Sequence, residues 1–553
     1  MNSLVLCAIV IAWLVIAYRW YGGLIDRRVV RPDDSQSPPS CSKFDGVDYC
    51  PGKPVVLFGH HFSSIAGAGP IIGPVAAVAA FGWGASILWV ALGVVFVGAV
   101  HDYVALMTSV RHGGRSLPEI AREVVGARAR LLFMIFVWLS LILIIAVFGV
   151  VAAKTLQSTP AIVIPTFAII PIAALFGWST YRMRLPVPLG TIASLVLLGG
   201  CIALGYVFPL SLPLAEEMAF RVWFAILILY GFIASVLPVW VLLQPRDYIS
   251  TWVLIVGMLL GFAGLAVSRP AMNAPFFIGW ESATQGPLWP MLFILIACGA
   301  VSGFHSLVAG GTTSKQLTKE SDGKIVGFGA MLMEAAVATL AIACVAAGLQ
   351  WAAPEGSQLS FFGVLSEGGP IKAFGVGYGS VTAPFLTVAV GTLVGITMLK
   401  TFVMTTLDTT VRITRFITTE LAGPRMPVFR NRVVSSLVGV VAAYLLGSSG
   451  KWSVLWPVFA SANQLVAALT LIILTAYLIG VKKPSAYTLY PAIFMLATTM
   501  AALVWNGVRF FFPPDGQSVN VTLGIACVVL LVLGGMLASE APRSVRAARK
   551  RAA

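Results

Sequence analysis

Apolar residues run through most of this chain in long stretches, separated by short segments that are rich in Gly, Pro and charged residues. A helix that crosses a bilayer needs roughly 20 apolar residues, so the pattern predicts about 15 spans and an all-α polytopic membrane protein. The span at 379–411 is long enough to be kinked or split. The predicted spans lie at 3–20, 57–80, 83–109, 130–153, 161–178, 189–209, 219–243, 250–268, 288–309, 325–350, 379–411, 433–448, 455–479, 486–507 and 520–539.

The spans differ in their polar content. Those at 130–153, 189–209 and 520–539 contain almost only Leu, Ile, Val and Ala, as expected for helices that face lipid or serve only for packing. Because polar groups at membrane depth are costly, we expect function to concentrate in the spans that carry them. These are 57–80, 83–109, 219–243, 288–309, 325–350, 379–411 and 455–479.

The sequence FGHHFSSIAGAGPIIGP, at residues 58–74, interrupts an apolar span with Gly and Pro. Such residues let the backbone leave helical geometry. In lipid, unpaired backbone survives only when it is buried in protein or lines a wet cavity. We predict that the amides of Gly67, Ala68 and Gly69 bind a substrate carboxylate, as freed amides at a helix start can do. The alternative is close helix packing through small residues.

Five spans later, the segment 219–243 is again interrupted, by Ser235 and Pro238, and runs in the opposite direction. Paired broken helices of opposite direction indicate an inverted repeat. We therefore predict a ten-helix core in which spans two to six and seven to eleven are related. Ser235 becomes a further candidate substrate-binding residue.

Composition and charge support a membrane protein. Of the 553 residues, 58% are hydrophobic and 10% are charged, against about 25% charged in soluble proteins. With the N-terminus outside, six Lys and Arg fall outside, Lys400 lies within a span, and the other 29 fall in cytoplasmic segments. This is the positive-inside rule. The net charge of +15 therefore indicates contact with lipid headgroups rather than with nucleic acid, and it favours an outside N-terminus and a cytoplasmic C-terminus.

No soluble domain is expected, because the loops at 270–287 and 351–375 are too short to hold a core. The first span lacks a basic leader region and a cleavage site, so we expect a retained helix. The seven cysteines show neither metal-type spacing nor a disulfide framework. We divide the chain into the first helix and its loop (1–53), the transport core with the broken helices (54–415), and the C-terminal helices with a basic tail (416–553).

Two histidines begin the first broken helix. Successive residues on a helix point about 100° apart, so His60 and His61 cannot face one partner. We predict that they anchor substrate or carry a proton, because histidine titrates near physiological pH. The alternative is that both imidazoles cap a cytoplasmic helix end.

Acidic residues within the spans supply further candidates for proton coupling, namely Asp102, Glu334 and Asp408. Asp102 follows His101 and forms either a proton relay with an imidazole or an ion pair with a neighbouring interfacial arginine. Lys400 lies two turns before Asp408, about 12 Å along a helix, which is too far for a direct pair.

A second polar, Gly-rich stretch, CGAVSGFHSLVAGGTT, lies in the ninth span. We predict that Ser302 and His305 bind substrate and that His305 also carries a proton. If sodium is the coupling ion, the hydroxyls of Ser306, Thr312 and Thr313 are its candidate ligands. The alternative is that these hydroxyls bond back to their own helix.

Four histidines together with Asp102 have the chemistry of a transition-metal site. The alternative hypothesis is therefore a membrane-embedded metal-binding enzyme that uses His60, His61, His101 and His305. The chain has no HExxH or CxxC spacing, no Walker loop and no GxSxG motif. We accordingly expect no metal, no cofactor and no enzymatic activity.

Several motifs resemble those of the carbon starvation protein A (CstA) family, in order along residues 18–480. They are DGVDYCPGKPVVLFGHHFSSIAGAGPIIGPV, LPVWVLLQPRDYIST, ACGAVSGFHSLVAGGTTSKQL, GAMLMEA, TTLDTTVRITRF and LWPVFASANQL. Residues shared with the family motifs include His60, His61, Gly67, Gly69, Pro70, Asp102, Arg246, Asp247, His305, Thr312, Glu334, Asp408 and Asn463. Lys400 departs from the acidic-neighbour pattern expected before TTLD.

The resemblance implies a secondary transporter of the bacterial inner membrane with a five-plus-five, LeuT/APC-like core. It implies import of peptides or pyruvate during carbon starvation, with a proton as the coupling ion and Na⁺ as the alternative. Both substrates carry a carboxylate, so one pocket at Gly67–Gly69 serves either. A nutrient sensor is disfavoured because no signalling domain is expected, and a channel because no repeated filter is present.

Overall fold

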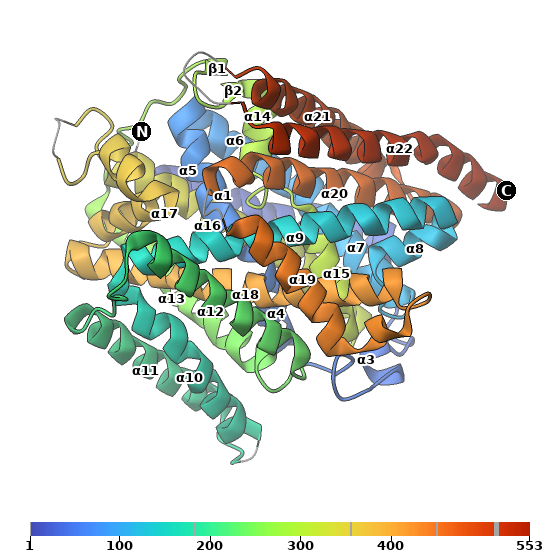
Figure 1. Cartoon of the computed structure of the whole chain (residues 1–553), viewed down its shortest axis with the longest axis horizontal. Coiled ribbons are helices and arrows are strands. Elements are labelled where there is room, and N and C mark those ends of the chain that lie inside the picture. Colours follow the sequence, from blue (N-terminus) through green and yellow to red (C-terminus); the bar gives the residue numbers. More distant parts are fainter. Residues whose placement is uncertain (1, 182, 354–356, 449–451, 514–518, 553) are drawn as a thin grey trace.

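The computed structural model describes residues 2–181, 183–353, 357–448, 452–513 and 519–552. Long helices form nearly all of the fold, and the one hairpin within the described residues pairs β1 (Glu281–Ser282) with β2 (Gly286–Pro287). Figure 1 shows a bundle in which the long helices lie side by side. The first helices are α1 (Ser3–Arg19), α2 (Tyr21–Ile25), η1 (Asp26–Val30), α3 (Pro39–Ser42), α4 (Pro54–Ala66), α5 (Gly69–Phe81), α6 (Trp83–Gly93), η2 (Val94–Gly98), α7 (Ala99–Arg111), α8 (Leu117–Val124) and α9 (Ala127–Ser158).

The rest of the chain continues the bundle. Its helices are η3 (Pro160–Ile162), α10 (Val163–Tyr181), α11 (Val187–Val207), α12 (Glu216–Val236), α13 (Leu243–Ser268), α14 (Leu288–Leu295), α15 (Gly303–Gly311), η4 (Thr313–Lys315), η5 (Glu320–Asp322), η6 (Lys324–Gly329), α16 (Ala330–Gly348), α17 (Phe361–Val381), α18 (Val388–Ala422), η7 (Pro427–Arg430), α19 (Arg432–Gly447), α20 (Trp452–Gly480), α21 (Ala486–Phe511) and α22 (Val521–Ala552).

The helix positions follow the hydrophobic pattern closely. Thirteen helical stretches among the described residues are long and apolar enough to cross a membrane. The two other predicted spans are short helices: 288–309 is divided between α14 and α15, and 433–448 is the 16-residue α19. The loop predicted at 351–375 is partly wrong, because α17 begins at Phe361 and bends at Gly369, where φ is +71°.

The predicted break in 219–243 is also displaced. Helix α12 is continuous to Val236, and Pro238 lies in the turn that leads to α13. The second broken helix is instead the pair α14 and α15, with a non-helical segment at 296–302 between them. Pro238 therefore follows the end of α12 and does not interrupt a helix.

The bundle has a packed centre and two outer layers. Helices α9 and α18 pack together along the centre, and α4 packs against α13 and α18. Helices α10 and α11 form a hairpin at one edge, while α20, α21 and α22 pack together at the opposite edge (Figure 1). This arrangement buries the polar residues of α4, α7, α15, α16 and α18 away from the lipid-facing helices.

Candidate functional site

The two broken helices touch at their breaks. A Cβ added at Gly69 would lie 2.5 Å from the Sγ of Cys298, and one at Gly73 would lie 2.2 Å from the carbonyl oxygen of Leu295. Gly67 adopts a φ of +40°, a conformation that favours glycine and ends α4. Among the described residues, the N–H groups of Gly67 and Ala68 have no backbone acceptor. The predicted break at Gly67–Gly69 is confirmed, and the second break lies directly beside it.

The second break is held by a residue of another helix. Asn463 of α20 accepts the backbone N–H of Phe304 at 2.8 Å through its Oδ1, and the same side chain bonds the hydroxyl of Ser302. Asn463 therefore supplies the capping hydrogen bond that the N-cap residue of α15, Ser302, does not make. Its contacts place Ser302 at the second break, and the substrate-binding role predicted for Ser302 stays a prediction.

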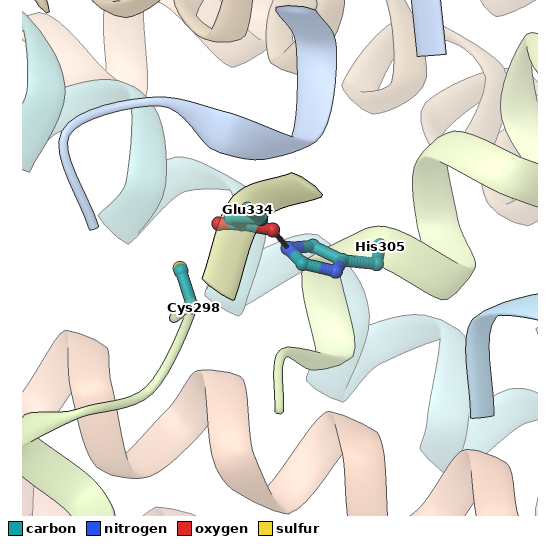
Figure 2. A group of neighbouring side chains, drawn as sticks. All are labelled: Cys298, His305 and Glu334. Carbon is teal, nitrogen blue, oxygen red and sulfur yellow. Dashed lines mark ion pairs between the residues drawn. The ribbon is translucent and has the colours of Figure 1, made fainter. Parts of the chain in front are cut away.

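A buried polar chain passes beside the breaks. His101 and His305 each donate an Nδ1–H to Asp102, at 2.7 Å to Oδ1 and 2.8 Å to Oδ2. The opposite nitrogen of His305, Nε2, lies 3.3 Å from an oxygen of Glu334, and Figure 2 shows the two side chains pointing at one another. All four side chains are fully buried. Neither this Nε2 nor the Glu334 oxygens form a hydrogen bond within the described part of the chain.

A second buried set lies between α4, α13 and α18. His60 Nδ1 lies 2.6 Å from Asp247, and Arg246 bonds both Asp247 (2.6 Å) and Asp408 (3.1 Å). Tyr230 also donates to Asp408, at 2.9 Å. One guanidinium thus joins two buried carboxylates that come from α13 and α18.

The other predicted coupling residues take separate partners. His61 lies 2.8 Å from the hydroxyl of Thr313, so the two neighbouring histidines do face different partners. Ser306 bonds the carbonyl of Gly303 and the hydroxyl of Thr470, while Thr312 bonds back to its own helix. The structure therefore directs the three candidate sodium ligands to different neighbours.

One sequence-based alternative is wrong. Asp102 forms no ion pair with Arg111 or Arg115; Arg111 pairs with Glu320 and Arg115 with Glu123. The hydroxyl of Ser235 bonds the hydroxyl of Ser436 and joins α12 to α19. Its predicted part in substrate binding stays a prediction.

The four-histidine metal cluster does not form. The imidazoles of His60, His61 and His101 engage Asp247, Thr313 and Asp102 separately. The group among the described residues whose donor atoms could hold a metal consists of Cys298, His305 and Glu334, with those atoms within 4.8 Å of one another (Figure 2). Sulfur, imidazole and carboxylate suit a zinc-like ion. The thiol of Cys298, however, already bonds Ser302 at 3.6 Å.

Two π-helical segments adjoin the site. Segment η2 directly precedes α7, which carries His101 and Asp102, and η6 directly precedes α16, which carries Glu334. A Cβ added at Gly98 in η2 would lie 2.3 Å from the carbonyl oxygen of Ala300 in the second break. Such segments widen a helix locally and are frequent at functional sites. Here they let α7 approach the break closely.

A cavity of about 640 Å³ opens on one side of the breaks. It is lined by the C-terminal end of α9 and by residues 365–372 around the bend of α17, and it reaches Ile72 on α5 and Ile396 on α18. One turn deeper along α18, Lys400 is fully buried and its ammonium donates to the carbonyl of Ala152 at 2.5 Å. As expected, Lys400 does not pair with Asp408.

On the opposite side of the breaks, the segment 45–52 packs against α18 and the residues Lys315 and Gln316. Asp48 of this segment forms ion pairs of 2.9 Å with Arg412 and 3.0 Å with Arg415, both on α18. Burial alone would raise the pKa of the Asp48 carboxyl, but these arginines and Lys315 hold that pKa below its usual value. Burial lowers the pKa of Lys315 to about 8, with Asp48 opposing the shift. The segment is therefore held by charge as well as by backbone hydrogen bonds.

Several residues of these networks had no predicted role in the sequence. Arg246 and Asp247 form the adjacent pair in the motif QPRDY, so an Arg–Asp dipeptide at a helix start was the available signal. Tyr230 lies in a span with no polar pattern around it, and its contact with Asp408 joins residues 178 positions apart. No local pattern could have identified it.

The family model for the carbon starvation protein CstA matches residues 2–354 and 355–502. The chain belongs to the CstA family. Curated CstA-family relatives cover nearly the whole chain. A pyruvate/proton symporter, BtsT of Escherichia coli K12, is 32% identical over 584 residues, which cover 90% of this chain and 80% of that protein. The peptide transporter CstA of Bacillus subtilis is 32% identical and covers 97% of this chain and 95% of its own.

Solved structures show the same fold as this CstA-family chain. A manganese transporter of Eremococcus coleocola superposes with a TM-score of 0.52 at 13% identity, over 90% of this chain and 95% of its own. MhsT in complex with L-phenylalanine gives a TM-score of 0.51 at 13% identity, over 90% of this chain and 99% of its own. These are LeuT-fold transporters. With its membership of the CstA family, the chain is a helical secondary transporter, as the sequence predicted.

Proposed function

We propose that this chain imports a small carboxylate, pyruvate or a short peptide, in symport with a proton. The observation that carries the proposal is the buried chain His101–Asp102–His305–Glu334, which lies beside the crossing of the two broken helices. A proton can pass between His305 and Glu334, because the Nε2 of His305 lies 3.3 Å from a carboxylate that has no hydrogen-bond partner among the described residues.

The first break supplies the groups that would bind the substrate carboxylate. The N–H groups of Gly67 and Ala68 have no backbone acceptor among the described residues, and α5 begins at Gly69 with its positive dipole end towards them. A substrate carboxylate held there brings one negative charge into the centre. A proton taken up by the neighbouring network brings one positive charge, so the two together avoid an unbalanced buried charge.

The names of the relatives and the distribution of charge along the chain support this proposal. The relatives of this chain in E. coli and B. subtilis carry the names pyruvate/proton symporter and peptide transporter. We place the protein in the bacterial inner membrane, with the N-terminus outside and the basic segments in the cytoplasm, because of its charge distribution. On that orientation, the segment 45–52 faces the cytoplasm and the cavity faces outward.

Uptake of labelled pyruvate, lactate, dipeptides and tripeptides into proteoliposomes, with and without an inward proton gradient, tests the proposal. For the wild-type protein, we expect one of these carboxylates to accumulate only with the gradient. His305→Gln removes the titratable imidazole at the junction with Glu334, so we expect gradient-driven accumulation to fall about a hundredfold, the size of a typical general acid–base contribution.

The matched control is His112→Gln. His112 is the one of the five histidines to which no role is assigned. It lies outside the buried chain, and its imidazole bonds the backbone carbonyl of Thr108 on α7. Accumulation by this variant should equal that of the wild type. Undiminished proton-driven uptake by His305→Gln would refute the proton role, and loss of uptake on chelation of metal ions would favour the metal-binding alternative at Cys298, His305 and Glu334.

A further inference from the structure

We propose that Lys400 forms a binding subsite for the substrate carboxylate at the inner end of the cavity. The inference rests on the proposed import of a carboxylate and names a residue to which neither the sequence motifs nor the relatives assign a role. Lys400 lies within α18 and its side chain is fully buried. Its ammonium has one partner within the described ranges, the carbonyl of Ala152 at 2.5 Å. In its ammonium form Nζ carries three N–H donors, so two remain for an anion that arrives beside it.

Lys400 lies on the path from the cavity to the breaks. Ile396, one turn before Lys400 on α18, lines the cavity. Val151 and Thr155, on either side of Ala152 on α9, line it as well. One helical turn is about 5.4 Å, so the ammonium lies just below the cavity floor.

The same two helices continue from Lys400 to the first break. A Cβ added at Gly67 would lie 2.9 Å from the hydroxyl of Thr406 on α18 and 3.6 Å from the ring of Phe148 on α9. Phe148 is one turn beyond Ala152, and Thr406 is about 9 Å beyond Lys400 along its helix. Along α9 and α18, Lys400 therefore lies between the cavity lining and the amides of Gly67 and Ala68.

The other buried cations of this region have acidic partners and Lys400 has none among the described residues. Arg246 pairs with Asp247 and Asp408, and Arg412 pairs with Asp48. A buried ammonium without a counter-charge costs several kcal/mol. A charge-assisted hydrogen bond from a carboxylate offsets that cost. The ligand class is thus a small monocarboxylate or the C-terminal carboxylate of a short peptide.

The test compares carboxylate and neutral probes on the purified full-length protein. Calorimetry gives the dissociation constants of pyruvate, methyl pyruvate, alanyl-alanine and alanyl-alanine amide. We expect Lys400→Met to weaken binding of the charged substrate about tenfold to a hundredfold, the effect of losing one charged hydrogen bond. Binding of the neutral counterparts should not change. The pair that responds, pyruvate or the dipeptide, shows which molecule supplies the carboxylate.

The matched control is Thr401→Val, next to Lys400 on α18. The Thr401 hydroxyl donates to the carbonyl of Met398 in its own helix, so substrate affinity should equal that of the wild type. If Lys400→Met does not fold, Lys400→Gln replaces it, because a glutamine amide is neutral and still donates to a carbonyl. Thermal melting in detergent reports the folding of each variant.

The outcomes separate the subsite from the proposed function. If the wild type imports a carboxylate and folded Lys400→Met or Lys400→Gln binds it equally tightly, the subsite is refuted and the proposed function stands. If the wild type binds and imports none of the carboxylates, both are refuted. Weaker binding of charged and neutral probes alike would show a loss of packing and would also refute the subsite.

Discussion

Single side chains set the geometry of both breaks. Gly67 ends α4 through a positive φ, which its own sequence context permits. The start of α15 depends instead on Asn463, which accepts the N–H of Phe304 from 159 positions away. The residue that shapes the first break belongs to that break, whereas the residue that shapes the second break lies on another helix. The two breaks therefore differ in how a substitution disturbs them.

At the residue scale, we predict that Asn463→Ala destabilises the protein by about 1–3 kcal/mol, because it leaves a buried N–H without an acceptor. The expected measurement is a lower midpoint of thermal unfolding in detergent. Asn431→Ala is the control: Asn431 caps α19 at the exposed end of a helix, and water can replace it there. Equal losses of stability in the two variants would contradict the role given to Asn463.

At the scale of elements, the crossing of the broken helices depends on close backbone contact. A Cβ at Gly73 would lie 2.2 Å from the backbone oxygen of Leu295, and the backbone there cannot move without separating α5 from α14. By contrast, a Cβ at Gly200 on α11 would meet nothing within 4 Å. Gly73 therefore permits a close contact between two helices, whereas Gly200 makes no such contact.

We accordingly predict that Gly73→Ala abolishes substrate uptake while Gly200→Ala preserves it. At Gly200, the change should even stabilise the helix by about 0.5–1 kcal/mol, the usual difference between alanine and glycine in a helix interior. Initial uptake rates in proteoliposomes, normalised to the amount of inserted protein, measure both effects. Full uptake by Gly73→Ala would show that the breaks do not need this contact.

The sequence predicted what local patterns determine. Among the described residues, the positions of the thirteen helices that are long and apolar enough to span a membrane follow from apolar run length, and the break at Gly67 follows from consecutive Gly and Pro residues. The break at 296–302 escaped prediction because its cap is on α20, and Pro238 suggested a false one because it follows a helix end. The contacts of Asp102 with His305 and of Arg246 with Asp408 join residues 203 and 162 positions apart. Periodicity carries no information about such pairs.

At the scale of the whole molecule, the two sides of the breaks differ. One side holds the cavity of about 640 Å³, and on the other the segment 45–52 packs against α18. Cys50 in this segment is buried, and its backbone N–H donates to the carbonyl oxygen of Lys315. Burial also raises the pKa of the Cys50 thiol, which keeps the thiol unreactive while the segment stays in place. Cys50 therefore reports whether this side is open.

We predict that Asp48→Asn exposes Cys50. Loss of the carboxylate leaves Arg412 and Arg415 without this counter-charge, at a cost of about 3 kcal/mol, so the rate of maleimide labelling at Cys50 should rise about a hundredfold. Peptide mass spectrometry measures that rate. Cys41, which is exposed, is the internal control and should label equally in both proteins. Unchanged labelling of Cys50 would contradict the closing role of Asp48.

The pH dependence of the same readout has a definite sign. The pKa of Asp48 lies below its usual value, so its ion pairs stabilise the closed segment at every pH above that usual value, about 4. They are lost as the pH falls through the lowered pKa. Labelling of Cys50 in the wild type should thus stay slow near neutral pH and accelerate only in stronger acid. For Asp48→Asn, the rate should not show this acid dependence.

The ion pairs between Asp48 and α18 also set the ratio of closed to open molecules. A transporter that releases substrate past the segment 45–52 must break the pairs with Arg412 and Arg415 once in each cycle. Every 1.4 kcal/mol in those pairs changes the fraction of open molecules about tenfold. A weaker pair would speed release but let the two sides open together more often, which would allow protons to leak without substrate. The strength of these two buried ion pairs would then balance turnover against the coupling of the proposed proton flux to substrate import.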